Sequence, residues 1–204
     1  MPCSHRFIDK FPTRTGLKFL FIGTFNPEWD SFDGVGSEFF YGRSKSLFWC
    51  ILPHAFEDSC LIDKGPKDWE YFCQERDIGL IDLVAAVENA EFSNDLDRKY
   101  LTDGYKDSSL EVKVEGHFRF ELHFTTSLIL KLVENNSKTL QGIILTRTSN
   151  QGIPRIWAEW LRIKEFAQTH NIPSIELPTP STRGIGIMDK IRIWRNAIRE
   201  LRFD

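Results

Sequence analysis

Short apolar runs alternate along the chain with stretches whose apolar residues recur every three or four positions. The runs are rich in Ile, Leu, Val and Phe and lie at 16–23, 79–87, 142–147 and 172–177. Continuous runs of this length are typical of strands buried on both faces, as in a parallel sheet. We therefore expect each run to form a buried strand or to begin with one.

Helical periodicity fills the intervals between these runs. The intervals predicted to be helical are 45–56, 68–77, 126–135, 154–171 and 188–203. Pro53 should end or kink the first helix, and Thr126 or Ser127 should cap the third. Because strands alternate with helices, the pattern predicts a mainly parallel sheet in an α/β layered fold.

The length and composition favour one domain. The chain has 204 residues, and a hydrophobic content of 41% is enough to fill a sizeable core. The stretch 91–119 departs from the pattern because it is polar and carries seven Asp or Glu residues. We therefore expect a single domain over 1–204, with an insertion or an exposed antiparallel ribbon at about 91–119.

Charge and cysteine usage narrow the function classes. Lys and Arg total 26 against 29 Asp and Glu, so the net charge of −3 excludes binding to nucleic acid or membranes by bulk charge. A localised basic face is still compatible with this balance. The chain has neither a signal-peptide pattern nor a membrane-spanning run, which predicts a cytoplasmic protein. The four cysteines fit no common metal-ligand spacing and are expected to be free thiols.

Three loops at the carboxyl ends of the predicted strands are the places to look for a ligand site. They read GTFNPEW, TRTSNQG and LPTPSTRGIG. The last combines the hydroxyls of Thr179 and Ser181 with Arg183 and two glycines just before a helix, a combination that suits an anion such as phosphate. The alternative is an ordinary Ser/Thr-Pro turn with a solvated arginine.

Aromatic side chains and cations follow the first of these loops. Residues 39–41 are Phe-Phe-Tyr, and Arg43 and Lys45 come directly after them. Flat rings beside positive charges suit a nucleobase and its backbone. An aromatic cluster of this kind can equally belong to the core, which is how we interpret Phe48 and Trp49.

Together these segments resemble the uracil-DNA glycosylase superfamily. The resemblance rests on GTFNP after an apolar strand, then FFYGRSKSLFWCIL, IGLIDLVAAV and the late LPTPST, in that order. It runs from about residue 18 to about residue 200, weakens across 91–119, and is closest to the hypoxanthine-DNA (deoxyinosine) glycosylase branch. The mismatch-specific uracil glycosylases are similar to a lesser degree.

The resemblance implies a three-layer α/β/α sandwich around a short, mainly parallel central sheet. It also implies a monomeric enzyme that binds DNA, flips out a deaminated base such as uracil or hypoxanthine, and cleaves the N-glycosidic bond with a positioned water. No metal or cofactor takes part in that reaction. The base-binding residues would be Thr24, Phe25, Phe40 and Tyr41. The residues that grip phosphate or push a wedge into the stack would be Arg43, Lys45, Thr179, Ser181 and Arg183.

The catalytic position is where the chain departs from those families. Mismatch-specific members have one residue fewer between the Gly and the Asn of the first loop, so Asn26 is the catalytic amide if the extra residue is allowed, and Phe25 takes its place otherwise. The hypoxanthine branch has an Asn where this chain has Ser46. The residue expected to fill the gap left by the flipped base falls near Ser181. Serine is too small for that role, so Arg183 would have to fill the gap.

Three side chains are therefore candidates for the chemistry. Asn26 offers a donor and an acceptor, Ser46 can hold a water, and Asp82 is a carboxylate embedded in an apolar strand. Asp82 could instead cap a neighbouring loop. The five histidines are scattered along the sequence, and none has a metal-ligand partner two or four residues away.

Three functional hypotheses remain open from the sequence. The first is a DNA glycosylase, the second is a catalytically inactive module that binds DNA or a nucleotide, and the third is a protein-binding scaffold. The first two predict a cleft between the loops at 23–29, 39–46 and 177–186. An enzyme should turn the Asn26 amide toward that cleft, whereas the scaffold should have the 39–45 loop packed shut.

Overall fold

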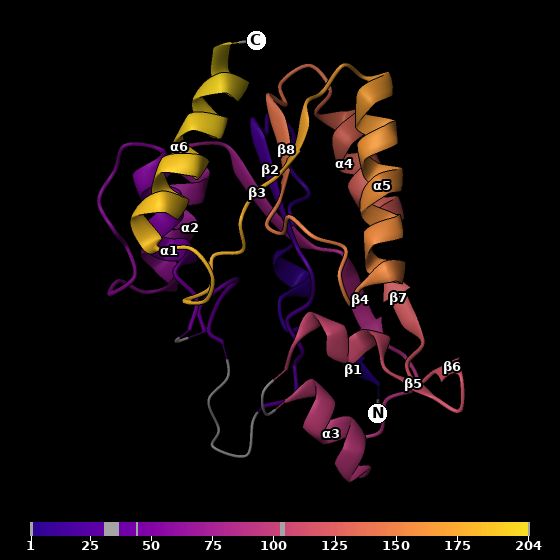
Figure 1. Ribbon diagram of the computed structural model, residues 1–204. Coiled ribbons are helices and arrows are strands. Elements are labelled where there is room, and N and C mark those ends of the chain that lie inside the picture. The colour runs from indigo at the N-terminus through magenta and orange to yellow at the C-terminus, as the bar shows by residue number, and fades with distance from the viewer. Residues whose placement is uncertain (1, 31–36, 44, 103–104, 204) are drawn as a thin grey trace.

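A four-stranded parallel sheet lies at the centre of the computed structural model, which describes residues 2–30, 37–43, 45–102 and 105–203 (Figure 1). The strand order is β3-β2-β8-β9. The strands are β2 (Phe19–Gly23), β3 (Ile78–Asp82), β8 (Gly142–Leu145) and β9 (Ser174–Glu176). All residues of β2, β3 and β8 are buried, which confirms the interpretation of their apolar runs, whereas the residues of the edge strand β9 are only half-buried.

Helices cover both faces of this sheet, so the fold is the expected three-layer α/β/α sandwich (Figure 1). One layer holds α1 (Phe48–Ala55), α2 (Pro66–Glu75) and α6 (Ile187–Phe203). The other holds α4 (Thr126–Asn135) and α5 (Pro154–Thr169). The predicted apolar stripes face the core: the buried residues are Ile156, Trp160, Ile163 and Ala167 on α5 and Ile191, Trp194, Ile198 and Leu201 on α6.

The apolar run at 79–87 forms two strands rather than one. It breaks at Leu83, and β4 (Val84–Val87) joins a second, antiparallel sheet between β1 (Cys3–Ser4) and β7 (Leu122–Phe124). The pairing with β1 carries the first residues of the chain to the end of β3, where the His5 N–H donates to the Ala85 carbonyl at 2.7 Å. The second sheet thus places an N-terminal side chain beside the carboxyl edge of the first.

The polar stretch 91–119 folds back on the molecule. It contains α3 (Asp95–Leu101), the 3-10 helix η2 (Asp107–Glu111) and an exposed hairpin of β5 (Lys113–Val114) and β6 (His117–Phe118). The Glu111 carboxylate accepts hydrogen bonds from the Arg155 backbone N–H at 3.0 Å and from its guanidinium at 2.8 Å. This contact at the start of α5 fixes η2 against the sandwich.

Two helix details concern expected helix ends. Pro53 lies inside α1, which ends two residues later at Ala55, and the Trp49 carbonyl, which a proline nitrogen cannot serve, accepts the Leu61 N–H at 2.7 Å. The residue at the N-cap of α4 is Thr125 rather than Thr126 or Ser127, and its side chain makes no cap hydrogen bond. The Thr125 hydroxyl donates instead to the Asp82 carbonyl at 2.6 Å.

The expectation of four free thiols was wrong for one pair, because Cys50 and Cys60 form a disulfide. The chain turns after α1 and runs back beside it, as the hydrogen bond from Leu61 to Trp49 shows, and this return brings the two cysteines together. Cys3 and Cys73 are free and buried, and burial raises the pKa of the Cys3 thiol to about 12. Within the described ranges, no helix is both long and apolar enough to cross a membrane.

The packing of α6 on the sheet predicts a measurable contrast along one helix. Ile198 is fully buried, so Ile198→Ala should lower the free energy of unfolding by about 2–5 kcal/mol. Met188 is 72% exposed on the same helix, and Met188→Ala should stay within about 0.5 kcal/mol of wild type. Urea unfolding followed by circular dichroism measures both, and equal losses would contradict the assigned faces.

Candidate active site

The carboxyl ends of the central strands meet at one edge, where a cleft of about 230 Å³ opens. Strand register places Gly23 beside Asp82 and Ile22 beside Leu145, so the loops leaving β2, β3 and β8 converge there. Besides these loops the cleft is lined by residues 41, 43, 45, 46 and 107 and by residues 179–181. Its lining residues are Gly23, Thr24, Phe25, Asn26, Tyr41, Arg43, Lys45, Ser46, Asp82, Asp107, Thr146, Thr179, Pro180 and Ser181.

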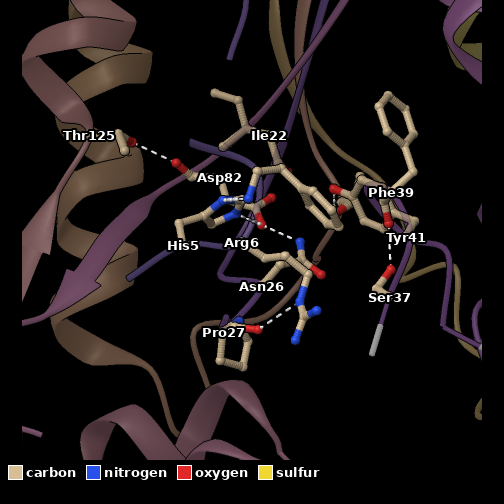
Figure 2. Close-up of polar contacts among 12 residues, drawn as sticks. His5, Arg6, Ile22, Asn26, Pro27, Ser37, Phe39, Tyr41, Asp82 and Thr125 are labelled. Carbon is tan, nitrogen blue, oxygen red and sulfur yellow. Dashed lines mark hydrogen bonds and ion pairs between the residues drawn. The ribbon is translucent and has the colours of Figure 1, made fainter. Parts of the chain in front are cut away.

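A hydrogen-bonded array of three side chains forms the floor of the cleft (Figure 2). Asp82 Oδ2 accepts hydrogen bonds from His5 Nε2 at 2.8 Å and from Asn26 Nδ2 at 2.6 Å. His5 Nδ1 accepts the Phe7 backbone N–H at 3.0 Å, so the imidazole proton must be on Nε2. The buried carboxylate therefore holds the Asn26 carboxamide in one orientation, and the histidine holds the carboxylate.

The second oxygen of Asp82 has no hydrogen-bond partner among the described residues although it is buried. It lies against Gly23, where an added Cβ would come within 2.2 Å of Asp82 Oδ1 and 2.6 Å of the Tyr41 hydroxyl. Glycine is required here because any side chain would collide with both groups. A buried acceptor without a hydrogen-bond partner lowers the stability of the fold by on the order of 1–3 kcal/mol.

Tyr41 supplies the aromatic wall of the cleft. Its ring stacks on Phe48 with centroids 3.9 Å apart, and its hydroxyl is 3.0 Å from the Thr146 hydroxyl. Tyr41 adopts a φ of 56°, which is uncommon for a residue with a side chain and turns the ring back toward the strand ends. Burial, with a smaller effect from Asp82, raises the pKa of the phenol well above its ordinary value.

A second carboxylate enters the cleft from the polar stretch. Asp107 accepts a hydrogen bond from Arg147 at 2.9 Å. Burial raises the pKa of Asp107, while Arg147 and the Thr24 side chain oppose that rise. Arg147 also donates to the carbonyls of Ser149 and Gln151, so it is held by its own loop.

The opposite wall consists of two loops joined by backbone contacts. Ser46 and Ser181 form an antiparallel bridge, and the Leu47 N–H donates to the Pro180 carbonyl at 2.6 Å. Beneath them Lys190, only 2% exposed, donates to the carbonyls of Ser181 at 2.5 Å and Arg183 at 2.7 Å. Desolvation lowers the pKa of this lysine. The phosphate-binding loop predicted from the sequence is therefore fastened from below by a buried cation.

Ten of the twelve residues proposed from the sequence line the cleft, and the structure leaves out Phe40 and Arg183. Phe40 is 1% exposed and packs against Phe7 and Phe11 in the core, and Arg183 is exposed and does not line the cleft. Ser46 accepts the Phe48 N–H at 3.3 Å at the start of α1. Ser44 lies outside the described residues.

The sequence did not single out His5, Asp107 or Thr146. His5 reaches the site through β1, and Asp107 reaches it through a stretch we had interpreted as an insertion. Thr146 directly follows β8. Its position was a usable signal, because residues just after parallel strands lie beside the ends of the neighbouring strands. Nothing local marks His5 or Asp107 in the sequence.

Two further cavities among the described residues, of about 370 Å³ each, lie away from the carboxyl ends of the strands. One lies between residues 10–14 and α2, and the other is near Lys18 and Arg202. In the described part of the chain, no three His, Cys, Asp or Glu side chains are placed to hold a metal ion.

Comparisons with known proteins identify the fold. No protein-family model and no curated protein matches the chain. A solution NMR structure of a candidate uracil DNA glycosylase from Methanosarcina acetivorans matches it with a TM-score of 0.53 and 18% sequence identity. The match covers 94% of this chain and 96% of the other. The two proteins therefore share a fold over nearly their whole lengths.

The array on the cleft floor predicts that the buried His5 contributes more to the free energy of unfolding than the exposed His123. His5→Phe leaves Asp82 Oδ2 and the Phe7 N–H each short of a buried partner, at a cost of about 1–3 kcal/mol for each group. His123 is exposed and pairs only with Glu88, so His123→Phe should change the free energy of unfolding by less than about 0.5 kcal/mol. Similar urea midpoints for the two variants would show that the His5 contact contributes little.

Proposed function

We propose that the protein is a DNA glycosylase that excises a deaminated base, uracil or hypoxanthine, by hydrolysis without a metal. The observation that carries the proposal is the fixed orientation of the Asn26 carboxamide on the floor of the cleft. The shared fold with a candidate uracil DNA glycosylase supports the same class of reaction.

Hydrolysis of an N-glycosidic bond needs an acceptor that positions a water and a donor for the charge that develops on the base. The Asn26 amide nitrogen donates a hydrogen bond to Asp82, and this bond fixes the direction of the Asn26 carboxamide oxygen. In this proposal the Asn26 oxygen holds the water near the sugar. His5 contributes by fixing Asp82, and it does so from a buried position without contacting the substrate.

An aromatic ring in the lining of the cleft supports a planar base as the ligand. The Tyr41 ring provides the face on which the flipped base would stack. Gly23 keeps the place of the Asp82 carboxylate and the Tyr41 hydroxyl free, since any Cβ there would collide with both.

The cations at the rim favour a polyanionic substrate despite the net negative charge. Arg43 and Lys45 line the cleft, and the hydroxyls of Thr179 and Ser181 line it from the loop that is bridged to the segment carrying Lys45. Arg43 also lies over the Tyr105 ring, with its guanidinium carbon 5.2 Å from the ring centroid, and burial lowers its pKa. We propose that these groups hold the DNA backbone beside the flipped nucleotide.

The first prediction from this proposal concerns Asn26. Asn26→Ala removes the acceptor for the water, so base excision from duplex oligonucleotides with uracil or hypoxanthine should fall by about a hundredfold or more. Asn150 is exposed in the loop after β8, and Asn150→Ala should leave excision unchanged. Abasic product is measured by alkaline strand cleavage.

Two results would contradict different parts of the proposal. If Asn26→Ala retains full activity, Asn26 is only a turn residue, and Ser46 or Asp82 becomes the better candidate for the chemistry. If wild type binds these duplexes and excises neither base, the inactive DNA-binding module replaces the enzyme as the better description.

A second prediction concerns the rim. Binding should weaken as salt rises, and Lys45→Ala should lower the slope of log K against log salt by about one unit. Lys138 is exposed at the opposite end of the sheet, before β8 begins, so Lys138→Ala should leave the slope as it is. Fluorescence anisotropy with a labelled duplex measures both. A slope that neither variant changes would place the DNA elsewhere.

A further inference from the structure

The cleft holds two carboxylates, and only one of them can meet a water. Asp82 is 1% exposed, and its Oδ2 is occupied by His5 and Asn26. The Asp107 side chain is 26% exposed and lines the same cleft. Among the described residues that line the cleft, Asp107 is therefore the one carboxylate open to both solvent and ligand.

The Asp107 carboxylate is also held in one position by its neighbours. Arg147 Nη1 donates to its Oδ2 at 2.9 Å, and Arg147 is in turn fixed by two carbonyls of its own loop. The Tyr105 hydroxyl lies 3.5 Å from Oδ1. Thr24, which directly follows β2, lines the same cleft. A positioned carboxylate of this kind is what general-base catalysis requires.

We infer that Asp107 is a catalytic residue, the carboxylate that faces the reacting sugar carbon and accepts the proton of the attacking water. The inference rests on the proposed glycosylase function and adds to it a residue from outside the loop that carries Asn26. Asn26 would orient the water, and Asp107 would supply the negative charge.

The reaction balances with these groups alone. The bond between C1′ and the base nitrogen breaks, and its electron pair leaves with the base, while positive charge develops on the sugar. The water oxygen forms the new bond to C1′, and its proton passes to Asp107. Asp107 then releases that proton to the departing base or to solvent, so the products are the neutral base and an abasic sugar.

The surroundings of Asp107 suit this role. Burial raises the pKa of its carboxyl, and nearby Asp82 adds to the rise, whereas Arg147 and Thr24 lower it. Arg43 faces the same side of the cleft across Tyr105. A base with a raised pKa accepts a proton more readily, yet it works only when ionised. Activity should thus decline as the pH falls through the raised pKa of Asp107, and Asp107→Asn should abolish that dependence.

Binding to charged and neutral sugar mimics tests the inference without requiring turnover. The probes are two duplexes that differ at one position, where one carries a cationic pyrrolidine in place of the sugar and base, and the other a neutral tetrahydrofuran. The pyrrolidine reproduces the positive charge of the reacting sugar, so wild type should bind it about a hundredfold more tightly, at the low end for transition-state mimics. Asp107→Asn should reduce this preference to near one.

Two further variants separate charge from structure. Asp107→Glu keeps the charge and should retain part of the preference for the cation. Asp95 is exposed on α3 in the same polar stretch, where it pairs with Arg98, so Asp95→Asn should keep the full preference. Unfolding midpoints for all variants show whether each one folds.

Each outcome decides a different point. A cation preference that survives in folded Asp107→Asn overturns the catalytic role and leaves the proposed glycosylase standing. Failure of wild type to bind either duplex overturns the proposed function and, with it, the catalytic role of Asp107. Loss of preference in Asp107→Asn, with partial recovery in Asp107→Glu, supports both.

Discussion

The candidate site depends on one buried carboxylate at the end of a parallel strand. Asp82 is desolvated at the edge of the sheet, and a charge in that position is tolerated only when donors surround it. Its oxygens and carbonyl are approached by His5 from the second sheet, Asn26 from the loop after β2, and Thr125 at the start of α4. The need to satisfy this group therefore draws three separate elements to one point, and the cleft forms around them.

The two walls of the cleft are built by different physical means. On one side, Lys190 and the bridge between Ser46 and Ser181 hold two loops through backbone groups, which leaves the outer side chains available. On the other side, ion pairing between Asp107 and Arg147 fixes polar side chains directly. The first arrangement suits contacts to a nucleic-acid backbone, which do not depend on base sequence. The second suits a position where one particular charge is needed.

The fold was largely readable from the sequence because its signals are local. Apolar runs gave the central strands, and the helical stripes of α5 and α6 matched the buried residues. Part of the site was readable because its residues end or closely follow a strand, as Thr24, Asn26 and Asp82 do. His5 and Asp107 arrive through β1 and η2, whose placement depends on tertiary packing and leaves no periodic signal. Phe40 has the same composition cue as Tyr41, but its ring packs in the core, whereas Tyr41 lines the cleft.

The long separations within the site bear on how it assembles during folding. The hydrogen bond between His5 and Asp82 spans 77 residues, and the bond between Asn26 and Asp82 spans 56. Such contacts form only after the intervening chain has collapsed, because closing each long loop costs entropy before any contact repays it. Local opening of residues 3–7 alone would release the Asp82 carboxylate while the sandwich stayed intact.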